Sequence, residues 1–241
     1  MCGRVTLTTS AERLAEEYAL SAWPPRDPRY NLAPTQLIEL LRPKPSADSN
    51  PDISLEVATV RWGFIPEWSQ PPYHPIINAR SETLASKPAF RKAFKLRRAL
   101  IPVDGFFEWE KIGRVRQPFL FRLKSRKPFV LGALWERNES DPNPESPQET
   151  CVILTTRANA LVAPLHDRMP VIIPRDRVTQ WLDIRADEPE KLCALMEPFP
   201  ADAMESVPVD RCVNDVKNNI PECLKPVTLA PRIIQGELDF G

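Results

Sequence analysis

Cysteine stands at position 2 of this chain, directly behind Met1 and in front of Gly3 and Arg4. A small side chain at position 2 permits removal of Met1, which would leave a thiol and an α-amine on adjacent carbons. The α-amine has an ordinary pKa near 8, so about a tenth of it is the neutral nucleophile at pH 7. Such an aminothiol can condense with an aldehyde to an imine and then close a thiazolidine ring. The alternative is a second residue without a chemical role.

Two titratable residues could assist this chemistry. Glu108 lies between Phe107 and Trp109, and burial among such neighbours would raise its pKa toward neutrality and suit it to general acid–base work. The alternative is an outward-facing strand glutamate. His166 precedes Asp167 and could shuttle a proton or donate a hydrogen bond. Its alternative is a loop histidine satisfied by the neighbouring carboxylate.

Further residues suit substrate positioning. Asn78 offers both a donor and an acceptor that could hold a new N-terminus, although a buried turn asparagine is the simpler interpretation. Trp68 could stack on a base, or it could belong to the core. Arg4, Arg80 and Arg168 are candidate phosphate ligands because a guanidinium group binds phosphate oxygens in a bidentate manner.

Composition indicates a soluble cytoplasmic monomer. The chain has 241 residues, 28 of them proline and 7 glycine, and this favours short strands and pinned loops. No stretch approaches a membrane span and no signal peptide is evident. The five cysteines form no CxxC pair and there are only two histidines. We therefore expect no metal, no cofactor and no disulfide framework, and a reducing bacterial cytoplasm.

Charge is unevenly distributed although the net charge is zero. Between Lys87 and Lys127 there are 13 basic and 3 acidic residues, a local balance of +10. This segment could be a solvated face or a surface that binds a polyanion, and the sequence favours neither.

The sequence predicts one α+β domain over residues 1–241, made of curved, largely antiparallel, barrel-like β-sheet with short peripheral helices. Polar loops are expected at residues 43–52 and 138–149 as hairpin insertions, and an irregular tail from Pro198, with residues 228–241 as its end. Strands are expected at Cys2–Thr8, Gln36–Arg42, Leu55–Trp62, Ala99–Val103, Phe106–Lys111, Pro118–Leu123, Phe129–Trp135, Cys151–Thr155 and Met169–Ile173. Helices are expected at Ser10–Ala19 with a capping box of Thr9 and Glu12, at Ser81–Leu96 with a break at Pro88, and at Arg157–Leu165, Arg175–Asp183 and Glu188–Met196.

Seven short motifs occur in a fixed order along the chain. They are Met1–Arg4, Arg29–Pro34, Arg61–Pro66, Asn78–Thr83, Ile101–Trp109, Leu165–Pro170 and Val213–Asn218. Together they resemble the SOS response-associated peptidase (SRAP) family, the abasic-site-shielding proteins, over essentially the whole chain.

The resemblance implies a protein that binds single-stranded DNA and traps the aldehyde of an abasic site with its N-terminal cysteine. It also implies autocatalytic removal of Met1 and a lyase-type activity. Catalytic roles carry over to Cys2, Asn78, Glu108 and His166. Matching DNA-binding positions are Arg4, Asn31, Pro34, Trp68, Arg80 and Arg168.

The chain departs from many relatives at two positions. Ser69 stands where they have a second tryptophan, which shortens the expected stacking platform. Ala99 stands where they often have cysteine, so a thiol there is not required for the chemistry.

Two other functions fit the sequence. One is a thiol peptidase acting on other proteins, with Cys2 and His166 as nucleophile and base. The other is a non-covalent nucleic-acid binding module. Separately, the tail Gln235–Phe240 has the Gln-x-x-Leu-x-Phe spacing of sliding-clamp-binding peptides, although packing of the tail against the domain is the simpler expectation.

Overall fold

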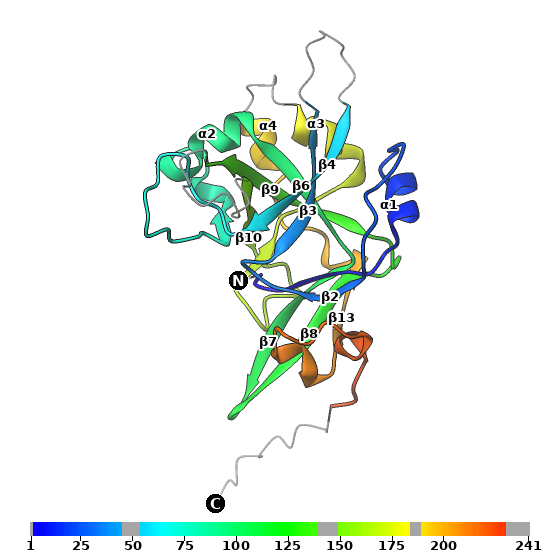
Figure 1. Ribbon diagram of the computed structural model, residues 1–241. Coiled ribbons are helices and arrows are strands. Elements are labelled where there is room, and N and C mark those ends of the chain that lie inside the picture. The colour runs from blue at the N-terminus through cyan, green and yellow to red at the C-terminus, as the bar shows by residue number, and fades with distance from the viewer. Residues whose placement is uncertain (1, 45–53, 139–148, 184–188, 230–241) are drawn as a thin grey trace, which may run out of the picture.

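The strands form two sheets in the computed structural model, which describes residues 2–44, 54–138, 149–183 and 189–229. Figure 1 shows the larger sheet above and the smaller sheet, with the long hairpin β7–β8, below it. The larger sheet contains β3 (Leu37–Pro43), β4 (Leu55–Trp62), β5 (Asn78–Arg80), β6 (Arg98–Val103), β9 (Phe129–Arg137), β10 (Glu149–Arg157), β11 (Arg168–Pro170) and β12 (Ile172–Ile173). The smaller sheet has the order β13 (Met204–Pro208), β8 (Val115–Leu123), β7 (Gly105–Ile112), β1 (Val5–Leu7) and β2 (Arg29–Leu32).

The larger sheet closes into a barrel. Strand β10 pairs with β4 on one edge and with β9 on the other, and β4, β3, β6 and β9 follow one another between them. The pairings of β10 with β4 and β5 are parallel, and the others among the described strands are antiparallel. The predicted fold class is therefore confirmed.

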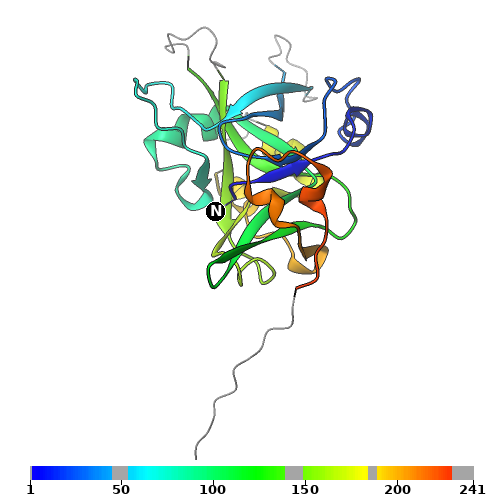
Figure 2. The same cartoon turned by 60° about the horizontal axis from the view of Figure 1, so that its bottom comes forward.

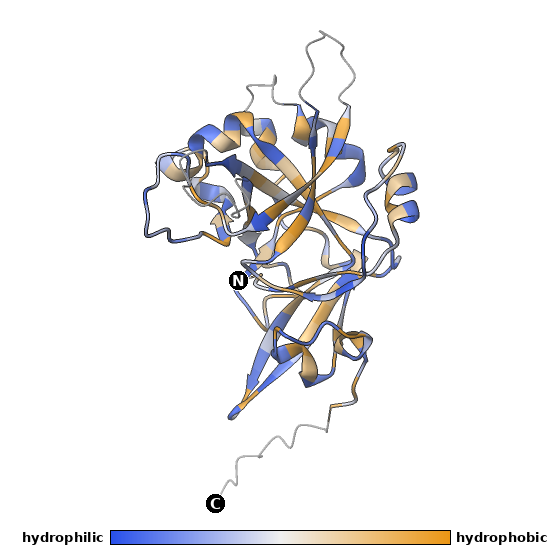
Figure 3. Cartoon of the chain, in the orientation of Figure 1, coloured by the Kyte–Doolittle hydropathy of each residue, from blue (hydrophilic) through white to orange (hydrophobic). Residues whose placement is uncertain are grey.

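Both faces of β6, β9 and β10 are largely buried, so these strands read as nearly continuous apolar runs. Along β6, Ile101 faces the barrel interior whereas Leu100 faces outward toward the helices, as the two-residue period of a strand requires. The cartoon coloured by hydropathy shows these strands as mostly hydrophobic (Figure 3). Each fully buried aliphatic side chain contributes about 1.5–3 kcal/mol, so this double layer fixes the register firmly.

Short helices cover the outer layer, namely α1 (Ala11–Glu17), α2 (Pro88–Leu96), α3 (Val178–Leu182) and α4 (Pro189–Ala194). Helix α2 starts at Pro88, where a missing N–H costs nothing, and buries Phe90, Ala93 and Phe94 at helical spacing. The predicted cap of α1 is wrong by one residue. Ser10 accepts from the Arg13 N–H, whereas the Thr9 hydroxyl donates to Asp104.

Short 3-10 segments complete the connections between the longer elements. They are η1 (Ser81–Thr83), η2 (Arg175–Arg177), η3 (Ala201–Ala203), η4 (Arg211–Asn214) and η5 (Pro221–Leu224).

Three further expectations are wrong. The predicted helix Arg157–Leu165 is a turn, because β10 runs on to Arg157 and the Asn159 side chain accepts the N–H groups of Leu161 and Val162. The predicted strand Met169–Ile173 is two strands separated at Val171, whose backbone binds Leu154 and Gly132. The segment after Pro198 is not irregular, since β13 pairs with β8 in register.

The two predicted polar loops connect strands that pair antiparallel on either side, Pro43 with Leu55 and Arg137 with Glu149. Most of both loops lies outside the described residues, as do residues 230–241, which include the Gln-x-x-Leu-x-Phe motif. In the described part, no helix is long and apolar enough to cross a membrane. The start of the chain lies between the two sheets in both views (Figures 1 and 2).

Candidate active site

Cys2 is buried where the barrel meets the smaller sheet. Strand β1 pairs antiparallel with β7, with Val5 opposite Phe106 and the Phe107 N–H donating to the Arg4 carbonyl at 3.0 Å. Continuing this register by one step brings Gly3 beside Glu108. The pairing of β1 with β7 therefore places the Cys2 segment next to Glu108.

The Cys2 thiol is 0% exposed and belongs to the interior cluster of the barrel. Burial raises the thiol pKa well above its usual range, and the nearby Glu108 carboxylate raises it further. The thiol is therefore uncharged at neutral pH and must lose its proton as it reacts.

Glu108 does not face solvent, since it is 5% exposed. It lies on the same face of β7 as Phe106, whose side chain belongs to the barrel interior, while Phe107 packs into a separate cluster below. Burial raises the pKa of Glu108 to about 7, against a downward pull from the positive amino terminus. The carboxyl group therefore holds and releases a proton near neutrality, which suits a general acid–base.

Asn78 joins Cys2 to the barrel. It begins β5, which pairs parallel to β10 with Asn78 opposite Ile153. Its Nδ2 donates to the Cys2 carbonyl oxygen at 2.8 Å. Its Oδ1 is buried and has no hydrogen-bond partner within the described residues. Buried acceptors are rarely left without a donor, so this atom marks a place where a donor belongs.

His166 follows the turn after β10 and is partly exposed. Its Nδ1 accepts the Arg168 N–H at 2.9 Å and also lies 2.9 Å from an Asp167 carboxylate oxygen. A neutral ring satisfies the first contact, and a protonated ring satisfies the second. Burial and the positive amino terminus lower the His166 pKa, which favours the neutral ring with its proton on Nε2. His166 then offers an N–H donor.

Arg4 and Asn31 are buried, and their side chains form hydrogen bonds to groups within the protein. The Arg4 guanidinium donates to Asn31 Oδ1 at 2.5 Å and to the Val213 carbonyl at 2.7 Å. Asn31 donates in turn to the carbonyl groups of Asp215 and Asn218. These bonds favour a structural role for both residues over phosphate binding.

Arg168 is also engaged inside the protein. Its guanidinium forms two hydrogen bonds to the Glu82 carboxylate, at 2.6 and 2.9 Å, and one to the Thr155 carbonyl oxygen at 2.5 Å. The hydrogen bond from Arg168 is the main cause of the lowered pKa of Glu82. Sequence analysis missed this role of Glu82, although it lies two residues after Arg80 in the Asn78–Thr83 motif. The pair fixes the segment that carries His166.

The remaining predicted DNA ligands are at or near the surface. Trp68 is 66% exposed, so it is not a core residue. Arg80 is exposed and lies two residues after Asn78 on β5, on the same face and about 6.6 Å further along the strand. Pro34 is half-buried. Arg80 and Trp68 are therefore the accessible members of the predicted set.

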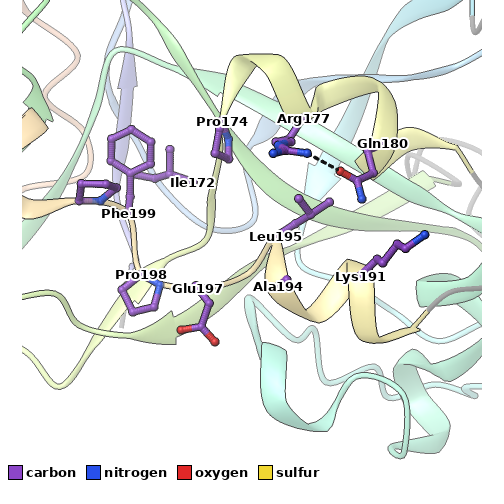
Figure 4. A pocket seen from close by; sticks show the side chains of 11 residues that line it. Ile172, Pro174, Arg177, Gln180, Lys191, Ala194, Leu195, Glu197, Pro198 and Phe199 are labelled. Atoms are coloured by element: carbon purple, nitrogen blue, oxygen red, sulfur yellow. Dashed lines mark hydrogen bonds between the residues drawn. The ribbon is translucent and has the colours of Figure 1, made fainter.

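The hollow drawn in Figure 4 lies elsewhere and has a volume of about 340 Å³. Side chains of β12, α3 and α4 line it, including Ile172, Gln180 and Lys191, and it contains none of the predicted site residues. Within the described ranges, no group of three or more His, Cys, Asp and Glu residues could hold a metal ion.

The family model of the SOS response associated peptidase (SRAP) matches residues 1–216. The chain is 36% identical over 232 residues to the abasic site processing protein YoqW of Bacillus subtilis, covering 93% of this chain and 99% of the relative. It is 32% identical over 241 residues to the abasic site processing protein YedK of Escherichia coli, covering 94% of this chain and 100% of the relative. The chicken (Gallus gallus) abasic site processing protein HMCES is 27% identical, covering 95% of this chain and 79% of the relative.

A solved structure from Bacteroides thetaiotaomicron shares the fold, with a TM-score of 0.80 at 22% identity, covering 94% of this chain and all of that chain. The match of the family model spans the segments that carry Cys2, Asn78, Glu108 and His166. This chain therefore belongs to the SOS response-associated peptidase family.

Proposed function

We propose that this protein processes abasic sites in single-stranded DNA, and that Cys2 captures the aldehyde of the opened sugar. One observation carries the proposal. The Cys2 backbone is hydrogen-bonded to Asn78, and the Glu108 carboxyl group nearby has a pKa of about 7. Asn78 Oδ1 is buried and accepts no hydrogen bond from the described residues. An α-amine on Cys2 would supply a donor to this atom. The relatives named abasic site processing proteins in bacteria and vertebrates support the same function.

The first step is cleavage of the Met1–Cys2 peptide bond. The Cys2 sulfur attacks the Met1 carbonyl carbon and gives up its proton to Glu108, the carbon–nitrogen bond breaks to leave a thioester and a free α-amine on Cys2, and one water then hydrolyses the thioester to release methionine and restore the thiol. Glu108 gives a proton to the departing amine nitrogen, which its pKa of about 7 allows at neutral pH. The free amine then donates to Asn78 Oδ1, which holds its lone pair in a fixed direction.

The second step joins protein and DNA. The neutral amine attacks the aldehyde carbon to form a carbinolamine, and Glu108 protonates the hydroxyl so that water leaves and an iminium remains. The Cys2 sulfur then adds to the same carbon and loses its proton, which closes a thiazolidine ring. One carbon–nitrogen bond and one carbon–sulfur bond form, and one water leaves. His166 Nε2–H donates to the sugar hydroxyl, and proton transfer from the imine at this position would lead to strand cleavage.

Single-stranded DNA suits this site because Cys2 is buried, so the lesion must leave a base stack to reach it. Arg80 is the accessible guanidinium on the strand that carries Asn78, and it suits a phosphate beside the lesion. The exposed ring of Trp68 offers a stacking surface for a neighbouring base.

The test is a denaturing gel of the purified protein with single-stranded DNA that contains one abasic site. We expect a band that resists denaturation, that is absent with undamaged DNA, and that is lost in Cys2→Ala. Intact-mass measurement should give the mass of protein plus DNA minus one water. A stable band from Cys2→Ala would overturn the proposal.

The same experiment separates the two other functions. A peptidase acting on other proteins would cleave casein, whereas under the proposed function casein should remain intact. A non-covalent binding module would retard abasic DNA on a native gel without giving any band on a denaturing gel.

A further inference from the structure

Cys212 and Cys223 lie side by side in a segment that is hydrogen-bonded to the strands beside Cys2. The segment runs from Pro208 to Val227 and is called the clamp below. Its two arms lie antiparallel, since Val209 bridges Pro226, the Asp210 N–H donates to the Lys225 carbonyl at 3.0 Å, and the Val227 N–H donates to the Pro208 carbonyl at 3.0 Å. Two residues further along each arm lie Cys212 and Cys223, whose sulfur atoms are in contact.

The two sulfur atoms lie 3.8 Å apart, and the Cys212 thiol donates to the Cys223 sulfur. The sulfur atoms need to approach by about 1.8 Å to bond. The 3-10 segments η4 and η5 carry the two cysteines and allow this adjustment by side-chain rotation.

The backbone around the pair is already held in place. The Asn218 side chain donates to the Cys212 carbonyl at 2.8 Å, and the Cys223 thiol lies 3.4 Å from the Asn218 carbonyl. The Asp210 carboxylate accepts the Cys212 N–H at 2.8 Å. Little backbone entropy remains to be lost, so closure of the bond is favoured over reaction with a second molecule.

The clamp contacts the Cys2 segment and the strands β2 and β7. The Val213 carbonyl accepts from Arg4 on the Cys2 segment, and from Asn31 of β2. Asn214 Oδ1 accepts from the Trp109 indole at 2.6 Å, and Trp109 directly follows Glu108 on β7. A covalent bond between the two arms of the clamp would therefore also restrict the motion of the segments that position Cys2 and Glu108.

We propose that Cys212 and Cys223 are a reversible dithiol–disulfide site that fastens the clamp beneath the active site. The co-reactant is a low-molecular-weight disulfide such as oxidised glutathione. Cys212 is partly exposed and reacts first, giving a mixed disulfide and one released thiol. The buried Cys223 then attacks the Cys212 sulfur and displaces the second thiol. Overall, two protein thiols are oxidised to one disulfide and one small disulfide is reduced to two thiols.

Burial raises the pKa of Cys212 to about 12, and the hydrogen bond to Cys223 adds to this shift. The attacking thiolate is therefore scarce at neutral pH. We expect oxidation to be slow there and to accelerate by up to about tenfold for each pH unit toward alkaline conditions.

The test uses the purified full chain, incubated with excess oxidised glutathione and then quenched with an alkylating reagent. We expect the intact mass to fall by about 2 Da and a non-reduced digest to contain the Cys212 and Cys223 peptides joined together. Cys212→Ser and Cys223→Ser should each lose this product. Cys193→Ser is the matched control, because it removes an exposed thiol elsewhere and should leave the product intact.

Stability supplies a second readout. Closing a loop between residues eleven positions apart should raise Tm by about 5 °C or more. Dithiothreitol should reverse the rise, and Cys212→Ser should show none. Alkylated Cys212 and Cys223 peptides after prolonged oxidation, or only mixed adducts with glutathione, would overturn the proposal. Because Cys212 is partly exposed, Cys212→Ser keeps the test decisive if Cys223→Ser does not fold.

Discussion

At the residue scale, the chemistry depends on where single side chains of one strand point. Glu108 and Phe106 share a face of β7 that is turned toward the barrel, while Phe107 and Trp109 face the cluster beneath. A carboxyl group on the apolar face loses its water and gains a raised pKa. The same residue on the other face would sit beside the clamp and far from Cys2.

Replacing Glu108 with glutamine removes the proton donor and keeps the shape. We expect Glu108→Gln to slow crosslinking about 100-fold, with little change in non-covalent DNA affinity. The wild-type rate should fall above about pH 7 as the carboxyl group ionises and fall again at low pH as the amine is protonated. Single-turnover gels across pH would measure this. Glu110→Gln, two residues further along β7, is the matched control and should keep the wild-type profile.

Glu108 should also make stability depend on pH. Its pKa is about 7 in the folded protein against an ordinary 4.5, so between these values the folded state binds the proton more tightly. Stability therefore falls as pH rises from about 4.5 to 7, by about 1–3 kcal/mol from this group. Glu108→Gln should lose this decline and exceed the wild type near pH 8. Urea unfolding at several pH values measures both, and parallel curves for the two proteins would contradict the prediction.

At the element scale, the short strand β5 carries one residue that contacts Cys2 and one that is exposed to solvent. Its first residue, Asn78, reaches Cys2 inside the protein, and its last, Arg80, lies exposed at the surface. The pairing of β5 with β10 fixes both, because the strand has only three residues and no independent stability. If Arg80 binds a phosphate as proposed, the pairing of β5 with β10 would hold that phosphate at a fixed distance from Asn78 and Cys2.

Arg80→Ala should remove one phosphate contact. With three to five contacts, log K should fall with log salt with a slope of about −2 to −4 on single strands, and the substitution should flatten it by about 0.7. Fluorescence anisotropy at several salt concentrations measures the slope. Arg114→Ala, at the exposed tip of the β7–β8 hairpin, is the matched control. Equal slopes for Arg80→Ala and wild type would remove Arg80 from the phosphate ligands.

Arg168 tests a different kind of role. Its bonds to Glu82 and Thr155 join η1 and β10 to the segment that carries His166. We expect Arg168→Ala to lower unfolding free energy by about 1–3 kcal/mol, because the Thr155 carbonyl loses a buried partner. It should slow crosslinking and leave the salt slope unchanged. A slope flattened as much as in Arg80→Ala would instead make Arg168 a phosphate ligand.

At the scale of the whole molecule, the start of the chain lies where the barrel meets the smaller sheet (Figures 1 and 2). Cys2 is completely buried there, so residues added before it would crowd the site. They would also keep the Cys2 nitrogen as an amide, which is not basic and forms no imine. Both the chemistry and the limited space around Cys2 therefore require that no residue precede Cys2 in the reactive protein.

A retained N-terminal extension should therefore abolish the stable crosslink, whereas a C-terminal tag leaves the amine free and should be harmless. Intact-mass spectrometry would show which preparations keep Met1, and a denaturing gel would show which form the adduct. Cys2→Ser should give at most a weaker, reversible product. A strong adduct from protein that fully retains Met1 would contradict the aminothiol mechanism.

Local pattern was sufficient for most of the barrel. The strands Leu55–Trp62 and Phe129–Trp135 were predicted closely, because Leu55–Trp62 is rich in β-branched and aromatic residues and Phe129–Trp135 is an apolar run buried on both faces. Prediction failed where a distant partner decides the local structure. The polar segment of β13 is a strand only because β8 supplies an open edge, and the turn after β10 forms around the Asn159 side chain instead of a helix.

The sequence by itself determined the family, the barrel-like fold and the identity of Cys2 as the reactive candidate, because short motifs and apolar periodicity are local properties of the chain. Only the tertiary structure decided what each polar side chain does. The sequence does not distinguish Arg4, Arg80 and Arg168 from one another. In the structure, Arg4 and Arg168 form hydrogen bonds within the protein, whereas Arg80 is exposed to solvent. The burial that raises the pKa of Glu108 likewise arises from segments far apart in sequence, and the contact between the Cys212 and Cys223 sulfur atoms depends on how the chain between them folds, since solvation and proximity depend on packing.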